Sequence, residues 1–159
     1  MRRLNARAKI VALLIAVLAL AACGGGSSRL SKPQYEQKIK TEGKALQSAF
    51  TSIDINTNKN LKELGTKIGQ LRTKLEQTAN DFDKLKPPKD AEADNRKIAQ
   101  TLHRFADIFG QLQKAANAGD RMKLAAGQSE LISASRAGAE ATNDLKSKGY
   151  DVGALGGTG

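Results

Sequence analysis

The sequence of 159 residues has very few of the side chains that build covalent, metal and redox sites. It contains one cysteine, one histidine and no tryptophan. A single cysteine excludes an internal disulfide, a c-type haem attachment motif and a thioredoxin-like pair of thiols. One cysteine and one histidine also fall short of the four ligands of a structural zinc site. The composition therefore argues against the common metal and redox proteins.

Large apolar side chains are scarce as well once the N-terminus is set aside. Without residues 1–22 the chain has 137 residues, of which Leu, Ile, Val and Phe together supply 25. Seventeen alanines remain in that part of the chain, and alanine favours helix over strand. A small core of Leu and Ala suits a helical bundle, because each helix then needs only one apolar stripe.

The N-terminus has the pattern of an export signal. Four basic residues, Arg2, Arg3, Arg7 and Lys9, precede an unbroken apolar run of 13 residues, 10–22. A helix needs roughly 20 apolar residues to span a bilayer, so this run is too short for an anchor. A basic start followed by a short apolar run is typical of a signal peptide. The sequence thus predicts that residues 1–22 are a signal peptide.

The end of this run, Leu20-Ala21-Ala22-Cys23, resembles the lipobox of bacterial lipoproteins. In that family the cysteine carries a thioether-linked diacylglycerol, and the signal peptide is cut before it. The resemblance implies lipidation of Cys23 and a place on the extracytoplasmic face of the cell membrane. The alternative is an ordinary secretory signal followed by an unmodified cysteine. Residues 23–30 are rich in Gly and Ser, which predicts a flexible tether after the lipidated cysteine.

Four segments then repeat apolar residues at spacings of three and four, which is typical of amphipathic helices. They cover residues 31–53, 61–85, 90–116 and 120–148. Ser31 is a good N-cap for the first segment, Pro87-Pro88 ends the second, and Leu71 and Leu75 are the predicted centre of the core. Short turns favour antiparallel neighbours.

The sequence therefore predicts an all-α fold, an up-down antiparallel four-helix bundle over residues 31–148 with a shorter first helix. The alternative is an extended three-helix coiled coil with a loosely attached first helix. Five glycines in residues 149–159 predict a disordered tail.

Candidate catalytic residues are few. His103 has Asp107 four residues later, which predicts an exposed pair on one helix face. No second histidine is present to activate a serine or to complete a metal site. The sequence predicts that the protein is not an enzyme and has no catalytic residue, no metal and no cofactor beyond the lipid on Cys23.

Polar residues interrupt the apolar seam of the fourth segment. Gln128, Ser135 and Thr142 occupy seam positions in the register that also contains Leu124, Leu131 and Leu145. Such a line of polar residues can border a narrow ligand cavity, but the sequence favours a second interpretation, a close approach of two helices. In that arrangement the hydroxyl groups bond to carbonyl groups of their own helix.

Charge is divided unevenly along the chain. Residues 29–89 contain 13 basic and seven acidic residues, whereas residues 90–159 contain nine of each. The candidate basic face comprises Lys59, Lys62, Lys67, Arg72 and Lys74. It predicts contact with anionic envelope polymers, lipid headgroups or another envelope protein, in addition to the bilayer that holds the anchor. The alternative is a solvated surface without a partner, and nucleic acid is not expected, because no aromatic residues alternate with the cations.

Two short motifs carry a further resemblance. Leu30-Ser31-Lys32-Pro33-Gln34-Tyr35 and Leu85-Lys86-Pro87-Pro88 are similar to segments of small actinobacterial lipoproteins. These relatives are expected to be helical and mostly lack an assigned activity.

The sequence favours a non-catalytic interaction module, and the alternative is a carrier of a small ligand. A cavity of about 300 Å³ bordered by the polar line favours the carrier. A closed core with the cations on one face favours the interaction module.

Overall fold

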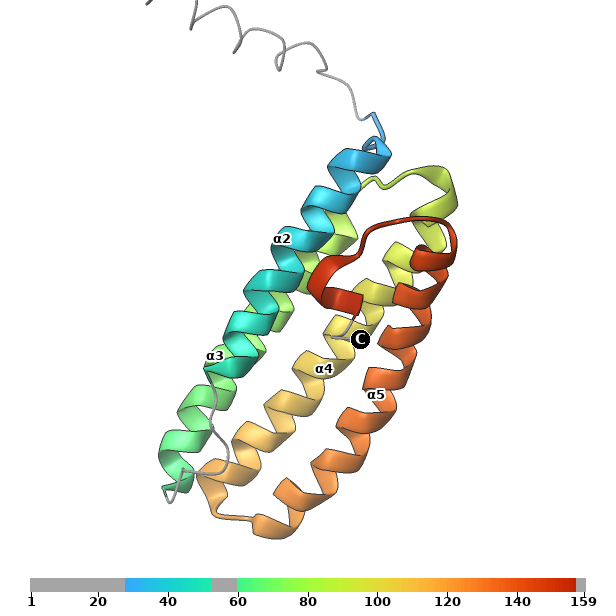
Figure 1. The fold of residues 1–159 in the computed structure, drawn as a ribbon. Helices are drawn as coiled ribbons and strands as arrows, with labels where there is room; N and C mark the ends of the chain where they lie inside the picture. The colour runs from blue at the N-terminus through green and yellow to red at the C-terminus, as the bar shows by residue number, and fades with distance from the viewer. Residues whose placement is uncertain (1–27, 53–59, 157–159) are drawn as a thin grey trace, which may run out of the picture.

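The computed structural model describes residues 28–52 and 60–156 (Figure 1). Its elements are four α-helices and two short 3-10 helices: α2 (Lys32–Thr51), α3 (Leu61–Lys84), η2 (Lys89–Ala91), α4 (Glu92–Ala118), α5 (Arg121–Ser147) and η3 (Gly153–Gly156). No strand occurs in the described ranges. The predicted all-α four-helix bundle is confirmed, with α2 the shortest of the four helices. The predicted signal peptide, Cys23 and Lys59 lie outside the described residues.

The helices begin and end where local sequence signals predict. The Ser31 amide donates a hydrogen bond to the side chain of Gln34 at 2.9 Å, before the first turn of α2. The Asp120 side chain accepts one from the Lys123 amide at 3.0 Å and caps α5. Gly119 ends α4 with a φ of 72°, a left-handed conformation that glycine adopts without strain. Each boundary is set by residues within one turn of it.

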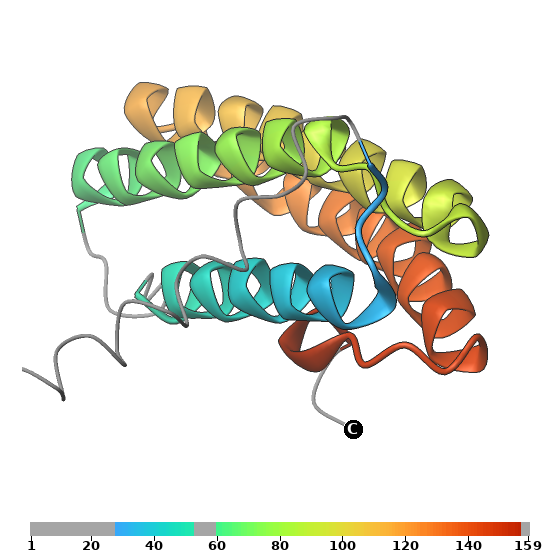
Figure 2. The ribbon, with the colours of Figure 1, turned by 90° about the horizontal axis from the view of Figure 1, so that it is seen from above.

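The four helices are not equivalent in their packing. α3 packs along α4, and α4 packs along α5, so that α4 has a neighbour on two sides (Figures 1 and 2). α2 packs on α3 and on η3 but makes no extended contact with α5. Within the described residues, no helix is long and apolar enough to cross a membrane. The bundle is thus closed on the α3–α4–α5 side and open between α2 and α5.

The predicted stripes of α3 and α4 form the core. Leu71 is 2% exposed and Leu75 is fully buried, and Ile98, Leu102 and Phe109 of α4 are also buried. The α4 helix buries a second set of residues that the single predicted stripe does not include. These are Ala99, Ala106, Ile108 and Ala115. Because α4 is flanked by two helices, small side chains on its other faces are enclosed as well.

The predicted seam of α5 is wrong by one residue at two positions, whereas Thr142 is buried as predicted. Gly127, Ala134 and Ala141 are buried, whereas Gln128 and Ser135 are exposed. The smallest residues of α5 face α4 because the two helices approach closely. A Cβ atom at Gly127 would overlap the Leu112 side chain. The leucines of α5 are compatible with both the predicted and the observed register. Packing against α4 therefore decides which of the residues next to these leucines point inward.

The prediction of a disordered tail is wrong for residues 149–156. Tyr150 and Val152 are 4% and 2% exposed, and they belong to the core. Gly149 and Gly153 have φ values of 77° and 52°, which let the chain turn back across α2. Leu155 then meets α2 at Gly43, where an added Cβ would lie 3.0 Å from the Leu155 Cγ. These glycines therefore make turns in a packed segment.

Candidate ligand-binding face

A hollow of about 330 Å³ opens among α3, α4 and α5 at the end of the bundle where α3 and α5 begin. We call it the α3–α5 hollow. Its walls are Leu61, Leu64 and Ile68 of α3, Phe109 and Leu112 of α4, and Arg121, Leu124, Ala125, Gln128 and Leu131 of α5. Arg121 and Gln128 provide the polar groups of the hollow, and its other wall residues are apolar.

Among the described residues, α2 contributes no wall to the α3–α5 hollow. The helix ends at Thr51, and the ring of Phe50 near that end meets Phe109 edge-on at 5.8 Å between centroids. Phe50 remains 41% exposed. The ring of Phe50 at the end of α2 is thus partly accessible from solvent, whereas Phe109 beneath it is buried.

A second hollow, of about 280 Å³, lies further along the same pair of helices, α4 and α5. We call it the α4–α5 hollow. Its walls are Ile98, Thr101, Leu102 and Phe105 of α4, Ser135, Gly138, Ala139 and Thr142 of α5, and Leu155. Both hollows belong to the side of the bundle that α2 leaves open.

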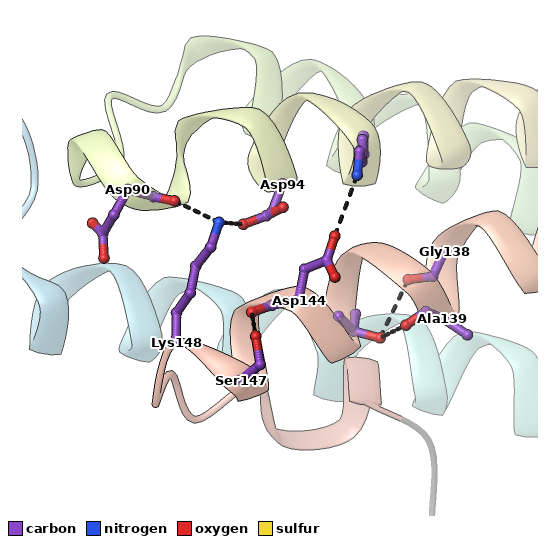
Figure 3. Close-up of polar contacts among 9 residues, drawn as sticks. Asp90, Asp94, Gly138, Ala139, Asp144, Ser147 and Lys148 are labelled. Carbon is purple, nitrogen blue, oxygen red and sulfur yellow. Dashed lines mark hydrogen bonds and ion pairs between the residues drawn. The ribbon is translucent and has the colours of Figure 1, made fainter.

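The predicted polar line does not border one cavity. Gln128 lies at the α3–α5 hollow, whereas Ser135 and Thr142 lie at the α4–α5 hollow. The Ser135 hydroxyl donates to the Leu131 carbonyl at 2.9 Å, and the Thr142 hydroxyl lies 3.0 Å from the Ala139 carbonyl (Figure 3). For these two residues, hydroxyls satisfied by their own helix are the correct interpretation. Gln128 makes no side-chain hydrogen bond within the described part of the chain.

The described members of the candidate basic face do not gather on one side of α3. Lys67 pairs with Glu63 at 3.3 Å, Arg72 with Glu76 at 2.8 Å, and Lys74 lies 3.8 Å from Glu42. A helix turns about 100° per residue, so Lys62, Lys67 and Arg72 follow one another at about 140° around the axis. Three of these cations therefore have intramolecular partners, and the set surrounds the helix.

His103 has a different partner from the predicted one. Its Nε2 lies 2.8 Å from the Asp83 carboxylate on α3, whereas Asp107 is exposed on α4. The pair links two helices and is itself partly exposed. Among the described residues, no group of three or more His, Cys, Asp or Glu side chains is arranged to hold a metal ion.

A buried charge pair joins the start of α4 to the end of α5. The side chain of Asp94 is 3% exposed, and the Lys148 ammonium donates to it at 2.6 Å and to the Asp90 carbonyl at 2.8 Å (Figure 3). The hydrogen bond to Asp94 raises the pKa of Lys148 above its ordinary value. Asp94 precedes Ile98 by four residues, so extending the apolar stripe of α4 by one turn would have predicted its burial.

A second buried carboxylate joins α2 to α3. Glu42 is 7% exposed and accepts hydrogen bonds from Lys38 at 3.3 Å and from Thr78 at 3.5 Å. Every buried side-chain nitrogen and oxygen atom in the described residues has a hydrogen-bond partner. The buried polar groups of the described residues are thus engaged in holding helices together.

No protein-family model matches this chain, and comparison with curated proteins and with solved structures finds no similar one.

Proposed function

We propose that this chain is a membrane-anchored extracytoplasmic lipoprotein that acts as a non-catalytic helical binding module. Lipidation of Cys23 supplies the anchor, and the open face between α2 and α5 supplies the binding surface. The ligand is an acyl chain that ends in an acidic group, and it enters the α3–α5 hollow.

The observation that carries this proposal is the α3–α5 hollow itself. Its volume of about 330 Å³ reaches the lower end of the range of small-molecule sites, which are mostly apolar with a few polar groups. Leucine, isoleucine and phenylalanine side chains suit the hydrocarbon part of a ligand. The site is a hollow open to solvent and not an enclosed cavity.

The acidic end of the ligand is inferred from the polar wall residues. Arg121 is exposed and makes no ion pair with another described residue. Its guanidinium group is suited to a carboxylate or phosphate, because it presents paired donors in one plane. Gln128, seven residues and about two turns further along α5, offers an amide on the same wall.

Contact with anionic partners through Lys59, Lys62, Lys67, Arg72 and Lys74 has less support. Lys67, Arg72 and Lys74 already lie beside carboxylates of the same chain. A surface with paired charges attracts a distant anion weakly, because the opposite charges cancel beyond a Debye length.

Titration with a fluorescent fatty acid tests the ligand site. The protein used is residues 24–159, which retain every residue of the described core. Gln128→Trp fills the α3–α5 hollow, and Ser133→Trp adds the same side chain to an exposed position of α5 outside it. We expect Gln128→Trp to abolish binding and Ser133→Trp to retain it.

Arg121→Gln tests the acidic end of the ligand. It should weaken binding of the acid by about tenfold or more, since a hydrogen bond to a charged group contributes at least about this factor. Binding of the corresponding alcohol should not change. Equal binding by Gln128→Trp and the unmodified protein, or no binding by the unmodified protein, would refute the ligand site.

A further inference from the structure

Three exposed lysines surround the connection between α3 and α4, and we define Lys84, Lys86 and Lys89 as the lysine loop. Pro87-Pro88 lies within it and stops α3 from continuing. None of the three side chains makes an ion pair or hydrogen bond with another described residue. We propose that the lysine loop binds the anionic headgroups of the membrane that holds the anchor. Headgroup binding would turn the lysine loop towards the membrane, and this orientation of the bundle rests on the proposed lipidation of Cys23.

The start of the described chain lies on the lysine loop. The Leu30 amide donates a hydrogen bond to the Lys86 carbonyl at 2.7 Å, and the Arg29 guanidinium donates one to the Pro87 carbonyl at 3.0 Å. A second nitrogen of Arg29 pairs with Glu92 at 3.0 Å. Residues 29 and 30 are therefore held to a loop more than fifty positions later in the sequence (Figure 1).

This contact limits how far the lysine loop can be from the anchor. Cys23 precedes Arg29 by six residues, and an extended chain of that length reaches about 20 Å at most. Lipid on Cys23 would thus hold the lysine loop close to the bilayer surface. Headgroup charges act over about 8–10 Å in physiological salt, and a tether of this length lets the three ammonium groups approach the surface to within that distance.

The carboxylates near the lysine loop are occupied by other groups. Glu92 pairs with Arg29 and Arg96, Asp90 accepts from the Tyr150 hydroxyl, Asp94 holds Lys148, and Asp83 holds His103. Asp81, one turn earlier on α3, makes no such pair with a described residue. Arg29, Arg96 and Lys148 bring three positive charges to this surface against the five carboxylates named here, so the three lysines change the sum of these charges from −2 to +1.

A hollow of about 420 Å³ lies beside the lysine loop. Lys86, Arg29 and Arg96 contribute to its walls, together with Asp83 and Glu92. Among these cations Lys86 is the one without a carboxylate partner. It is therefore available to a phosphate group that enters the hollow from the membrane side.

Sedimentation with vesicles tests the proposal on residues 24–159, which lack the anchor cysteine. Vesicles of phosphatidylglycerol mixed with phosphatidylcholine should bind the protein at low salt and release it as salt is raised. Vesicles of pure phosphatidylcholine should not bind it. The triple variant Lys84→Gln, Lys86→Gln, Lys89→Gln should lower binding by at least about tenfold, because each lysine near an anionic surface contributes about fivefold.

A matched triple variant separates the lysine loop from net charge. Lys44→Gln, Lys114→Gln and Arg136→Gln remove the same charge from three exposed positions elsewhere, whose side chains also lack partners in the described chain. This variant should bind almost as the unmodified protein does. Circular dichroism confirms the fold of both, and single substitutions replace any triple variant that does not fold.

Three outcomes would overturn the proposal. The first is an equal loss of vesicle binding in the two triple variants. The second is no vesicle binding by the unmodified protein at low salt. The third is binding to a soluble anionic polymer but not to anionic vesicles. Since the vesicle assay needs neither Cys23 nor the α3–α5 hollow, its result is independent of lipidation and of ligand binding.

Discussion

At the scale of single residues, the two tyrosines of the sequence join distant parts of the chain. Their rings meet edge-on with centroids 5.8 Å apart, and the Lys32 ammonium lies 4.6 Å from the Tyr150 ring centroid. The Tyr35 hydroxyl donates to Asn95 at 3.1 Å, and that of Tyr150 donates to Asp90 at 2.8 Å. The phenols thus bind α2 and the C-terminal segment to the start of α4.

Alkaline titration should reveal the buried environment of the two tyrosine hydroxyl groups. Burial, and then the hydrogen bond to Asp90, raises the pKa of Tyr150 to about 12, and burial also raises the pKa of Tyr35. The folded protein therefore holds these protons more tightly than the unfolded chain, where a tyrosine pKa is about 10. The resulting stabilisation is fully present below pH 10 and is lost as the pH rises towards 12.

Ultraviolet absorbance of tyrosinate measures the ionisation of the two tyrosines directly, and the helix content is followed in parallel. We expect little ionisation at pH 10 in the folded protein, and ionisation together with loss of helix at higher pH. The same protein in denaturant should be half ionised near pH 10. A tyrosine that ionises near pH 10 in the folded protein would contradict the buried arrangement.

At the scale of elements, α5 shows how a helix can be located correctly and oriented incorrectly. Its limits follow from Asp120 as N-cap and Gly149 as stop, which are local features of the sequence. The residues of α5 that face inward cannot be identified from local features, because Ala, Gly, Ser and Thr alternate along the helix with few large apolar residues. Close packing against α4 selects Ala134 over Ser135.

Two leucine substitutions on neighbouring residues test the register of α5. Ala134 is fully buried, so Ala134→Leu should lower the free energy of unfolding by about 1–3 kcal/mol through overpacking. Ser135→Leu, at an exposed position, should change it by about 0.5 kcal/mol or less. Urea unfolding measures both, and the opposite order would restore the register predicted from sequence.

At the scale of the whole molecule, the C-terminal segment completes the bundle. Residues 150–155 pack on α2, and Lys40 of α2 forms an ion pair with Asp151 at 2.5 Å. The side chains of this segment reach α2 where α5 does not. The first helix is therefore held by α3 on one side and by the end of the chain on the other.

Truncation should separate this packed segment from the last residues. Deleting residues 149–159 removes the buried Tyr150 and Val152, and burial of such side chains contributes about 1.5–3 kcal/mol each. We expect the free energy of unfolding to fall by about 3 kcal/mol or more. Amide hydrogen exchange in α2 should become faster. Deleting only residues 157–159 should change little. Equal stability of the two truncated proteins in thermal unfolding would show that the segment does not hold α2.

Anchoring is also a property of the whole molecule. Metabolic labelling with a fatty-acid probe should mark the protein in a bacterial host that processes lipoproteins. Cys23→Ala should abolish the label and release the protein from the membrane fraction, because Cys23 is the only thiol in the chain. Labelling that persists in Cys23→Ala would remove the lipid anchor from the proposed function.

The candidate site was predictable only in part. The sequence singled out Gln128, which does border the α3–α5 hollow, but it placed Ser135 and Thr142 in the same cavity. It did not indicate that Leu61, Leu64 and Phe109 would border a hollow beyond the end of α2, since this depends on where α2 crosses its neighbours. The lysine loop was also not identified, because the contact of Arg29 with Pro87 joins residues 58 positions apart.

The sequence alone determined the four helices, their limits and the apolar stripes of α3 and α4. Helical hydrogen bonds and caps form between residues within about one turn, and strong stripes of leucine leave one face to bury. The tertiary structure decided the register of α5, the packed C-terminal segment, and the partners of Lys148 and His103. These features depend on which surfaces meet, and small or charged side chains are compatible with several arrangements until a neighbouring helix selects one.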